Sequence, residues 1–140
     1  MISSLHYITQ DSLPLSHSAQ VNLALQGGVK WVQFRSKTLS TSDIRREALV
    51  IKELCKRNDA IFILNDNWKL AIELELDGVH VGLTDTPISE IRKHSNFIIG
   101  GTANTFEDIN LHHSHGANYV GVGPFKHTTT KKNLSPTLGI

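Results

Sequence analysis

Short apolar runs alternate with longer amphipathic stretches along the chain. The short runs are rich in β-branched and aromatic residues, which is typical of strands, whereas the stretches between them repeat apolar residues at helical spacing. The predicted strands are residues 5–9, 31–36, 60–66, 78–82, 97–102 and 119–123, and the predicted helices lie near residues 16–27, 41–57, 67–75, 86–94 and 105–116.

Helix-capping residues support two of these helices, because Ser40 precedes the second helix and Thr105 begins the fifth. Strands and helices that alternate this regularly predict right-handed βαβ units and a parallel sheet. Both faces of such a sheet are covered, so a row of polar residues on one strand is not simply a solvated face.

The predicted strand at 31–36 begins such a row. Gln33, Arg35 and Lys37 occupy alternate positions, with Val32 and Phe34 between them. Side chains alternate between the two faces of a strand, so we expect the polar row to face the interior and to bind a strongly charged ligand. Val32 and Phe34 are then expected to face the helices.

Polar residues and glycines also gather where the other predicted strands end, and ligands of parallel α/β proteins bind at the carboxyl ends of strands. One shared site is therefore predicted. Cations and hydroxyls suit phosphate oxygens, and carboxylates beside them suit a Mg²⁺ that bridges to phosphate. The candidates are the cations Arg35, Lys37 and Lys131, the carboxylates Asp66 and Asp85, and the hydroxyl-rich loop 127–132.

The composition is that of an ordinary globular domain, with 140 residues, 39% of them hydrophobic and 19% charged. A net charge of +1 argues against nucleic-acid binding, which needs clustered basic residues. No apolar run has the length of a membrane span and the first residues do not resemble a leader, so we expect a cytoplasmic protein. Cys55, the one cysteine, is expected to pack within a helix.

Five segments resemble the thiamine phosphate synthase family in order and spacing: VQFRSK, ILND, DGVHVGLTD, IIGGTANT and YVGVGPFKHTTTKK. The resemblance runs from about residue 5 to the end of the chain. It implies a TIM (β/α)8 barrel and a transferase that joins a hydroxymethylpyrimidine diphosphate to a thiazole phosphate and releases pyrophosphate. Only about the first six strands of the barrel are visible, and a complete barrel needs about 200 residues or more. We therefore expect residues 1–140 to be a single barrel domain that is incomplete at its C-terminal end.

The resemblance also implies roles for individual residues. Mg²⁺ is the implied cofactor, held by Asp66 and Asp85, while Arg35, Lys37 and Lys131 would stabilise the departing pyrophosphate. The implied pyrimidine diphosphate residues are Gln33, Arg35, Lys37, Asn65, Thr102 and Lys131, and the implied thiazole phosphate residues are Thr128 and Thr130.

The chain departs from the family pattern at Ser36, where an acidic residue is usual, and at Asn104, where histidine is usual. In addition, GLTD replaces the commoner GQED at 82–85, and FKHTTTKK replaces FPTPTKK from residue 125. These changes spare the implied metal and pyrophosphate residues, so they bear mainly on how the substrates are placed.

Structural alternatives stay open for several of these residues. Asp66 and Asp85 could each cap the helix that follows. His80 lies in the middle of a predicted strand, where a hydrogen-bonded interior histidine is expected more often than a ligand. The histidines of the HHSH segment at 112–115 end a helix, where they favour the helix dipole, and we expect no metal there.

Two alternative functions also stay open. A thiazole tautomerase uses the same barrel, but that relative typically carries a histidine after the glycine that ends the sixth strand, where this chain has Pro124. Proline cannot transfer a proton, which argues against the isomerase. A phosphate-binding protein without catalysis is favoured only if the chain truly ends at Ile140. The sequence leaves open whether the protein forms a homo-oligomer.

Overall fold

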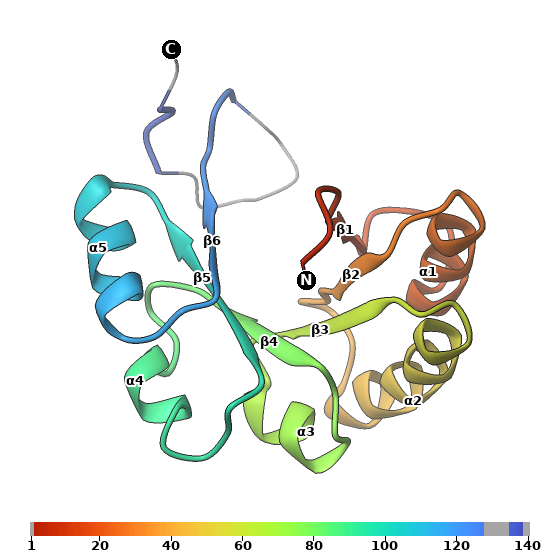
Figure 1. Cartoon of the computed structure of the whole chain (residues 1–140). Coiled ribbons are helices and arrows are strands. Elements are labelled where there is room, and N and C mark those ends of the chain that lie inside the picture. Colours follow the sequence, from red (N-terminus) through yellow and green to blue (C-terminus); the bar gives the residue numbers. More distant parts are fainter. Residues whose placement is uncertain (1, 128–134, 139–140) are drawn as a thin grey trace. The chain divides into compact units, whose positions relative to one another are not determined.

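The computed structural model describes residues 2–127 and 135–138, in which strands and helices alternate (Figure 1). The strands of this part of the chain are β1 (Tyr7–Ile8), β2 (Trp31–Phe34), β3 (Ile61–Asn65), β4 (Gly78–Val81), β5 (Ile98–Ala103) and β6 (Tyr119–Val122). Its helices are α1 (His17–Gln26), α2 (Thr41–Arg57), α3 (Trp68–Glu73), α4 (Ile88–Ile91) and α5 (Phe106–Ser114). Each predicted element is present with somewhat different ends, so the predicted α/β class is confirmed.

The chain divides into two compact units, Met1–Val79 and His80–Ile140, and β4 runs from one into the other. In the first unit β1, β2 and β3 pair in sequence order and in parallel, with Tyr7 opposite Val32 and Gln33 opposite Ile63. In the second unit β5 pairs in parallel with β6. Parallel neighbours that follow each other in sequence require the helical crossovers that the alternating pattern predicts.

The core of the first unit lies between its strands and the pair of helices α1 and α2, which pack beside each other (Figure 1). All four residues of β2 are buried, including the polar Gln33 at 2% exposure. The Phe34 ring lies 4.8 Å from the ring of His17 in α1, measured between centroids. Phe34 therefore faces the helices, as the alternation along the strand predicts.

Local capping sets the start of two helices. The Ser40 hydroxyl accepts a hydrogen bond from the Asp43 N–H at 3.1 Å, and Thr105 forms a capping box with Asp108 at the start of α5. Both predicted caps are confirmed. Cys55 is buried in α2, and this burial, aided by the charge of Asp77, raises the pKa of its thiol to about 12. The cysteine is thus a packing residue, as expected.

No helix in the described part of the chain combines the length and the apolar character needed to cross a membrane.

Strand β2 ends at Phe34, two residues earlier than predicted. The Thr9 N–H donates to the Gln33 carbonyl at 2.9 Å. The next N–H on this side of β2, that of Arg35, donates to the Thr9 hydroxyl at 3.0 Å, so the backbone hydrogen bonds between β1 and β2 do not continue. Of the predicted polar row, only Gln33 lies within the strand. Arg35 and Lys37 belong to the segment that follows it.

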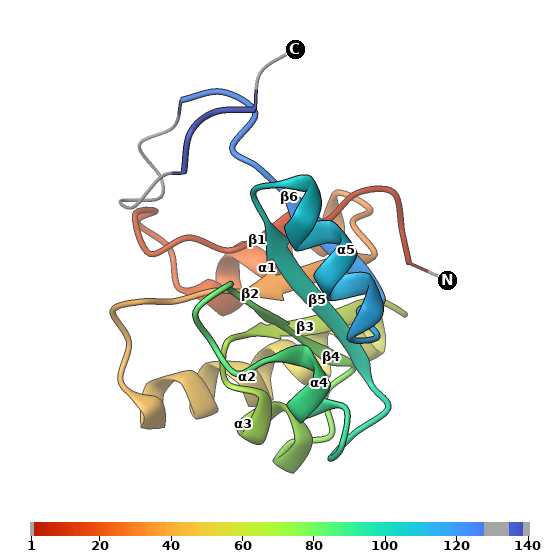
Figure 2. The same ribbon diagram turned by 90° about the vertical axis from the view of Figure 1, so that its left-hand side faces the viewer.

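In the second unit, α5 lies along β5 (Figure 2), and two glycines of β5 make room for rings. A Cβ at Gly101 would lie 2.8 Å from the His112 ring, and one at Gly100 would lie 2.1 Å from Cζ of Tyr119. Each glycine thus permits an approach that no larger residue allows without a shift.

Gly100→Ala is expected to lower the free energy of unfolding by about 1–3 kcal/mol, the usual cost of overpacking a core. Urea denaturation of the complete protein measures this change. The same substitution in a Tyr119→Ala background is expected to cost much less, because the clashing ring is gone. Equal losses in both backgrounds would show that the ring is not the cause.

Candidate functional site

The first unit brings predicted site residues together at the carboxyl ends of β2 and β3. Lys37 follows β2, Asp66 follows β3, and the Lys37 ammonium donates to the Asp66 carboxylate. The two side chains are 51% and 34% exposed, and ion pairs this exposed contribute at most about 1 kcal/mol. An anionic ligand for Lys37 or a cation for Asp66 would therefore replace this contact at little cost.

Asp66 has a left-handed backbone conformation, with φ of +63°. The N-cap of α3 is Asn67, whose side-chain oxygen accepts from the Leu70 N–H at 3.1 Å. The alternative in which Asp66 caps this helix is therefore wrong. Residues other than glycine rarely have a positive φ, and the few that do are often found at functional sites. Asn65, the last residue of β3, is half-buried just before this turn.

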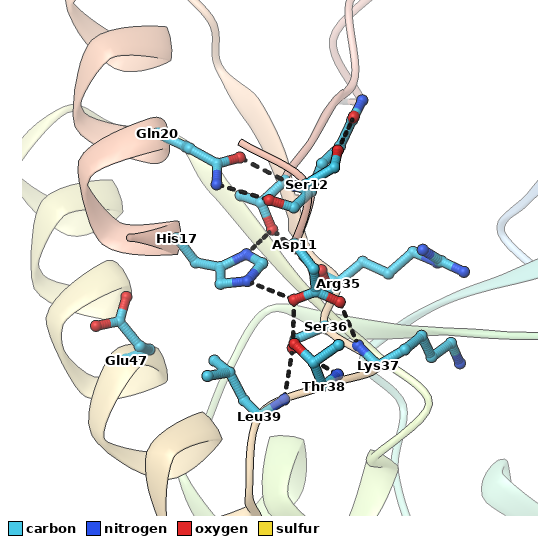
Figure 3. A network of polar contacts seen from close by, with 12 residues as sticks. Asp11, Ser12, His17, Gln20, Arg35, Ser36, Lys37, Thr38, Leu39 and Glu47 are labelled. Carbon is cyan, nitrogen blue, oxygen red and sulfur yellow. Dashed lines mark hydrogen bonds and ion pairs between the residues drawn. The ribbon is translucent and has the colours of Figure 1, made fainter. Parts of the chain in front are cut away.

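A network of polar contacts holds the segment 35–37 that carries the two cations (Figure 3). One oxygen of Asp11 accepts from the Ser36 hydroxyl at 2.6 Å and contacts His17 Nε2 at 2.9 Å, and the other accepts from the Lys37 N–H at 2.7 Å. Partial burial raises the pKa of the Asp11 carboxyl, but the hydrogen bonds from Lys37, Ser36 and His17 outweigh it and hold that pKa below its ordinary value.

Asp11 and His17 were not among the residues that the sequence pattern singled out. Asp11 follows the first predicted strand, and polar residues at strand ends were the signal that led to Arg35 and Asp66. The same rule applied to the first strand would have found Asp11. His17 carries no such signal, because it lies in the first turn of a helix.

Thr102 of the second unit is held on two sides by histidines. His80 Nε2 lies 3.1 Å from the Thr102 hydroxyl, and His112 Nε2 donates to the Thr102 carbonyl at 2.7 Å. His80 Nδ1 in turn lies 3.1 Å from the hydroxyl of Tyr119, whose pKa is raised by burial. His80 is thus half-buried and hydrogen-bonded through both ring nitrogens, in agreement with the predicted structural role, and Thr102 has a defined orientation.

Asp85 does not cap a helix either. Its carboxylate accepts from the Gly82 N–H at 2.6 Å and closes the turn after β4, whereas the N-cap of α4 is Pro87, which has no side-chain cap. The cap alternative for Asp85 is therefore wrong. Within the described residues no group of three or more His, Cys, Asp and Glu is arranged to hold a metal ion. Proteins usually bind Mg²⁺ through one or two carboxylates, and substrate phosphates supply further oxygen ligands. A carboxylate such as Asp66 in the first unit or Asp85 in the second is therefore the kind of ligand that suits this ion.

The remaining predicted site residues, Thr128, Thr130 and Lys131, lie outside the described residues. The second unit also contains a cavity of about 460 Å³ beyond the carboxyl end of β5. It is lined by Leu83, Asn104, Thr105, Asp108, Ser135, Pro136, Thr137 and Leu138. Asn104, which stands where the family usually has histidine, also donates to the Gly123 carbonyl at 2.5 Å.

Parallel strands joined by helices, paired in sequence order within each unit, define a parallel α/β protein. The family model described as thiamine monophosphate synthase matches residues 5–140. The chain therefore belongs to the thiamine monophosphate synthase family, and the predicted family is confirmed.

Individual relatives agree with this assignment. The chain is 52% identical over 139 residues to the thiamine-phosphate synthase of Bacteroides fragilis, covering 98% of this chain and 68% of that protein. It is 48% identical to the thiamine-phosphate synthase of Bacteroides thetaiotaomicron, with 98% and 66% covered. Among solved structures, thiamine phosphate pyrophosphorylase from Pyrococcus furiosus superimposes with a TM-score of 0.85 at 27% identity, covering 96% of this chain and 64% of that one. The chain thus spans about two thirds of the length of these relatives.

Proposed function

We propose that this protein condenses a hydroxymethylpyrimidine diphosphate with a thiazole phosphate on a (β/α)8 barrel, giving thiamine phosphate and pyrophosphate. The observation that carries the proposal is the placement of two cations, Arg35 and Lys37, on one anchored segment beside Asp66. The names of the relatives support the same reaction. Small molecules are the partners that this function needs, and we place the reaction in the cytoplasm.

The proposed reaction needs no acid or base on the protein. The bond between the pyrimidinylmethyl carbon and the diphosphate oxygen breaks, and its electron pair leaves with the pyrophosphate. The lone pair of the thiazole nitrogen then forms the new carbon–nitrogen bond, and no proton is transferred. Catalysis therefore consists mainly of stabilising negative charge on the leaving group and of holding the two substrates in line.

The residues of the chain divide these tasks. Arg35, Lys37 and Lys131 would neutralise the charge that develops on pyrophosphate, with Arg35 able to bind two oxygens at once. Mg²⁺ held by Asp66 and Asp85 would supply further neutralisation of the diphosphate oxygens. Polar side chains would orient the substrates: Gln33, Asn65 and Thr102 the pyrimidine diphosphate, and Thr128 and Thr130 the thiazole phosphate.

The complete protein, incubated with both substrates and Mg²⁺, is expected to release pyrophosphate and to form thiamine phosphate in equal amounts. Coupled detection of pyrophosphate together with chromatography of thiamine phosphate measures both products. Conversion between thiazole isomers without pyrophosphate release would instead identify the tautomerase.

A further inference from the structure

Two residues just after β1, Thr9 and Asp11, anchor the segment 35–37, which carries the two cations. The Arg35 N–H donates to the Thr9 hydroxyl at 3.0 Å, and the Lys37 N–H donates to Asp11 at 2.7 Å. Between them, the Ser36 hydroxyl donates to Asp11 at 2.6 Å. Each residue of the segment is thus held by a side chain from the preceding βα unit.

His17 joins the two anchors into one network. It is 5% exposed, and its Nδ1 lies 2.7 Å from the Thr9 hydroxyl while its Nε2 lies 2.9 Å from Asp11. The neutral tautomer with a bare Nε2 is excluded, because its lone pair would face the Asp11 carboxylate. With a proton on Nε2, the ring donates to Asp11 and can accept from Thr9, so every group in the network has a suitable partner.

We propose that Asp11 and His17, acting with Thr9, are positioning residues that hold the Arg35 and Lys37 side chains ready for the substrate diphosphate before it binds. This inference rests on the proposed function. Figure 3 shows the Arg35 and Lys37 side chains extending to the same side, away from the Asp11 carboxylate.

The contacts of Asp11 argue for positioning over direct binding. Its carboxylate carries the same sign of charge as a diphosphate, and its oxygens already accept three hydrogen bonds or ion-pair contacts from within the network. The Lys37 side chain is 51% exposed, so packing does little to restrict it and the anchored backbone limits its range. A segment that is already ordered before binding loses less conformational entropy when the ligand binds.

Kinetics of the complete enzyme test the proposal with Asp11→Ala, Asp11→Asn and His17→Phe, the last of which keeps a ring against Phe34. A contact made in both the ground state and the transition state affects KM more than kcat. Arg35 and Lys37 would contact the diphosphate before and during its departure, so we expect the KM for the pyrimidine diphosphate to rise about tenfold or more and kcat to fall by a smaller factor. His17→Gln, which keeps a donor for Asp11, is expected to recover part of the loss seen in His17→Phe.

Glu47→Ala is the matched control. Glu47, in α2, accepts a hydrogen bond at 2.7 Å from the N–H of Ser18, the residue that follows His17 in α1. None of its described hydrogen bonds reaches the segment 35–37. This variant is expected to keep the wild-type KM even if the melting temperature falls. Wild-type KM in the Asp11 and His17 variants, with only a lower melting temperature, would overturn the proposal. If Asp11→Ala does not fold, the KM values of Asp11→Asn and His17→Phe provide the same test of the proposal.

Calorimetry with Mg²⁺ and inorganic pyrophosphate separates this inference from the proposed function. The Asp11 and His17 variants are expected to bind pyrophosphate about tenfold more weakly than the wild type, whether or not thiamine phosphate is formed. Weakened binding without any turnover in the wild type would refute the proposed function and support the positioning role. Turnover by the wild type, with unchanged pyrophosphate affinity in the variants, would support the proposed function and refute the positioning role.

Discussion

Asp66→Asn and Asp85→Asn are each expected to lower magnesium-dependent turnover by at least about 100-fold, the scale of losing one strong electrostatic contact to the departing group. The amide keeps the shape of the side chain but removes the anionic oxygen that Mg²⁺ prefers. At position 66 asparagine also tolerates the left-handed φ of +63°, so the turn after β3 should keep its conformation. Initial rates of the complete enzyme across a Mg²⁺ titration, with circular dichroism to verify folding, measure the effect.

Asp59→Asn is the matched control, because Asp59 also has a positive φ, of 49°, but lies before β3 and not after it. This variant should retain wild-type turnover at every Mg²⁺ concentration. The assignment of the metal residues fails if Asp66→Asn and Asp85→Asn behave like this control. A loss of rate that excess Mg²⁺ restores would be the clearest sign that the carboxylates hold the ion.

Arg35→Ala is expected to weaken binding of the pyrimidine diphosphate by at least about 2 kcal/mol, or about 30-fold in affinity, which is the scale of a lost charge-assisted hydrogen bond. Arg35→Lys should also weaken binding clearly, because one ammonium cannot make the two parallel contacts of a guanidinium. Calorimetry of the complete protein with this substrate alone measures both affinities.

The control for net charge is Arg46→Ala. Arg46 pairs with Asp43 on the exposed side of α2, and its side chain is 72% exposed. Arg46→Ala changes the net charge by the same amount as Arg35→Ala. It should leave the affinity for the pyrimidine diphosphate within about twofold of the wild type, since exposed ion pairs contribute little. An Arg35→Ala variant that binds as tightly as Arg46→Ala would show that Arg35 has no part in the site.

Much of the fold was accessible from the sequence because its signals are local. Helical spacing of apolar residues and the caps at Ser40 and Thr105 lie within a few consecutive residues, and the order of strands and helices follows from them. The candidate residues at the ends of β2 and β3 followed from the same pattern, since parallel strands bring their carboxyl ends to one edge. The roles of Thr128, Thr130 and Lys131 stay predictions.

The sequence by itself therefore determined the class of the protein, the succession of its elements and the side chains available for phosphate chemistry. Only the tertiary structure decided how those side chains are held. The end of β2 at Phe34 depends on Thr9, and the anchoring of Lys37 depends on Asp11, which lies 26 residues earlier. Such contacts join residues far apart in the chain, and their geometry arises from the packing of β1 against β2, so no local pattern of hydrophobic and polar positions encodes them.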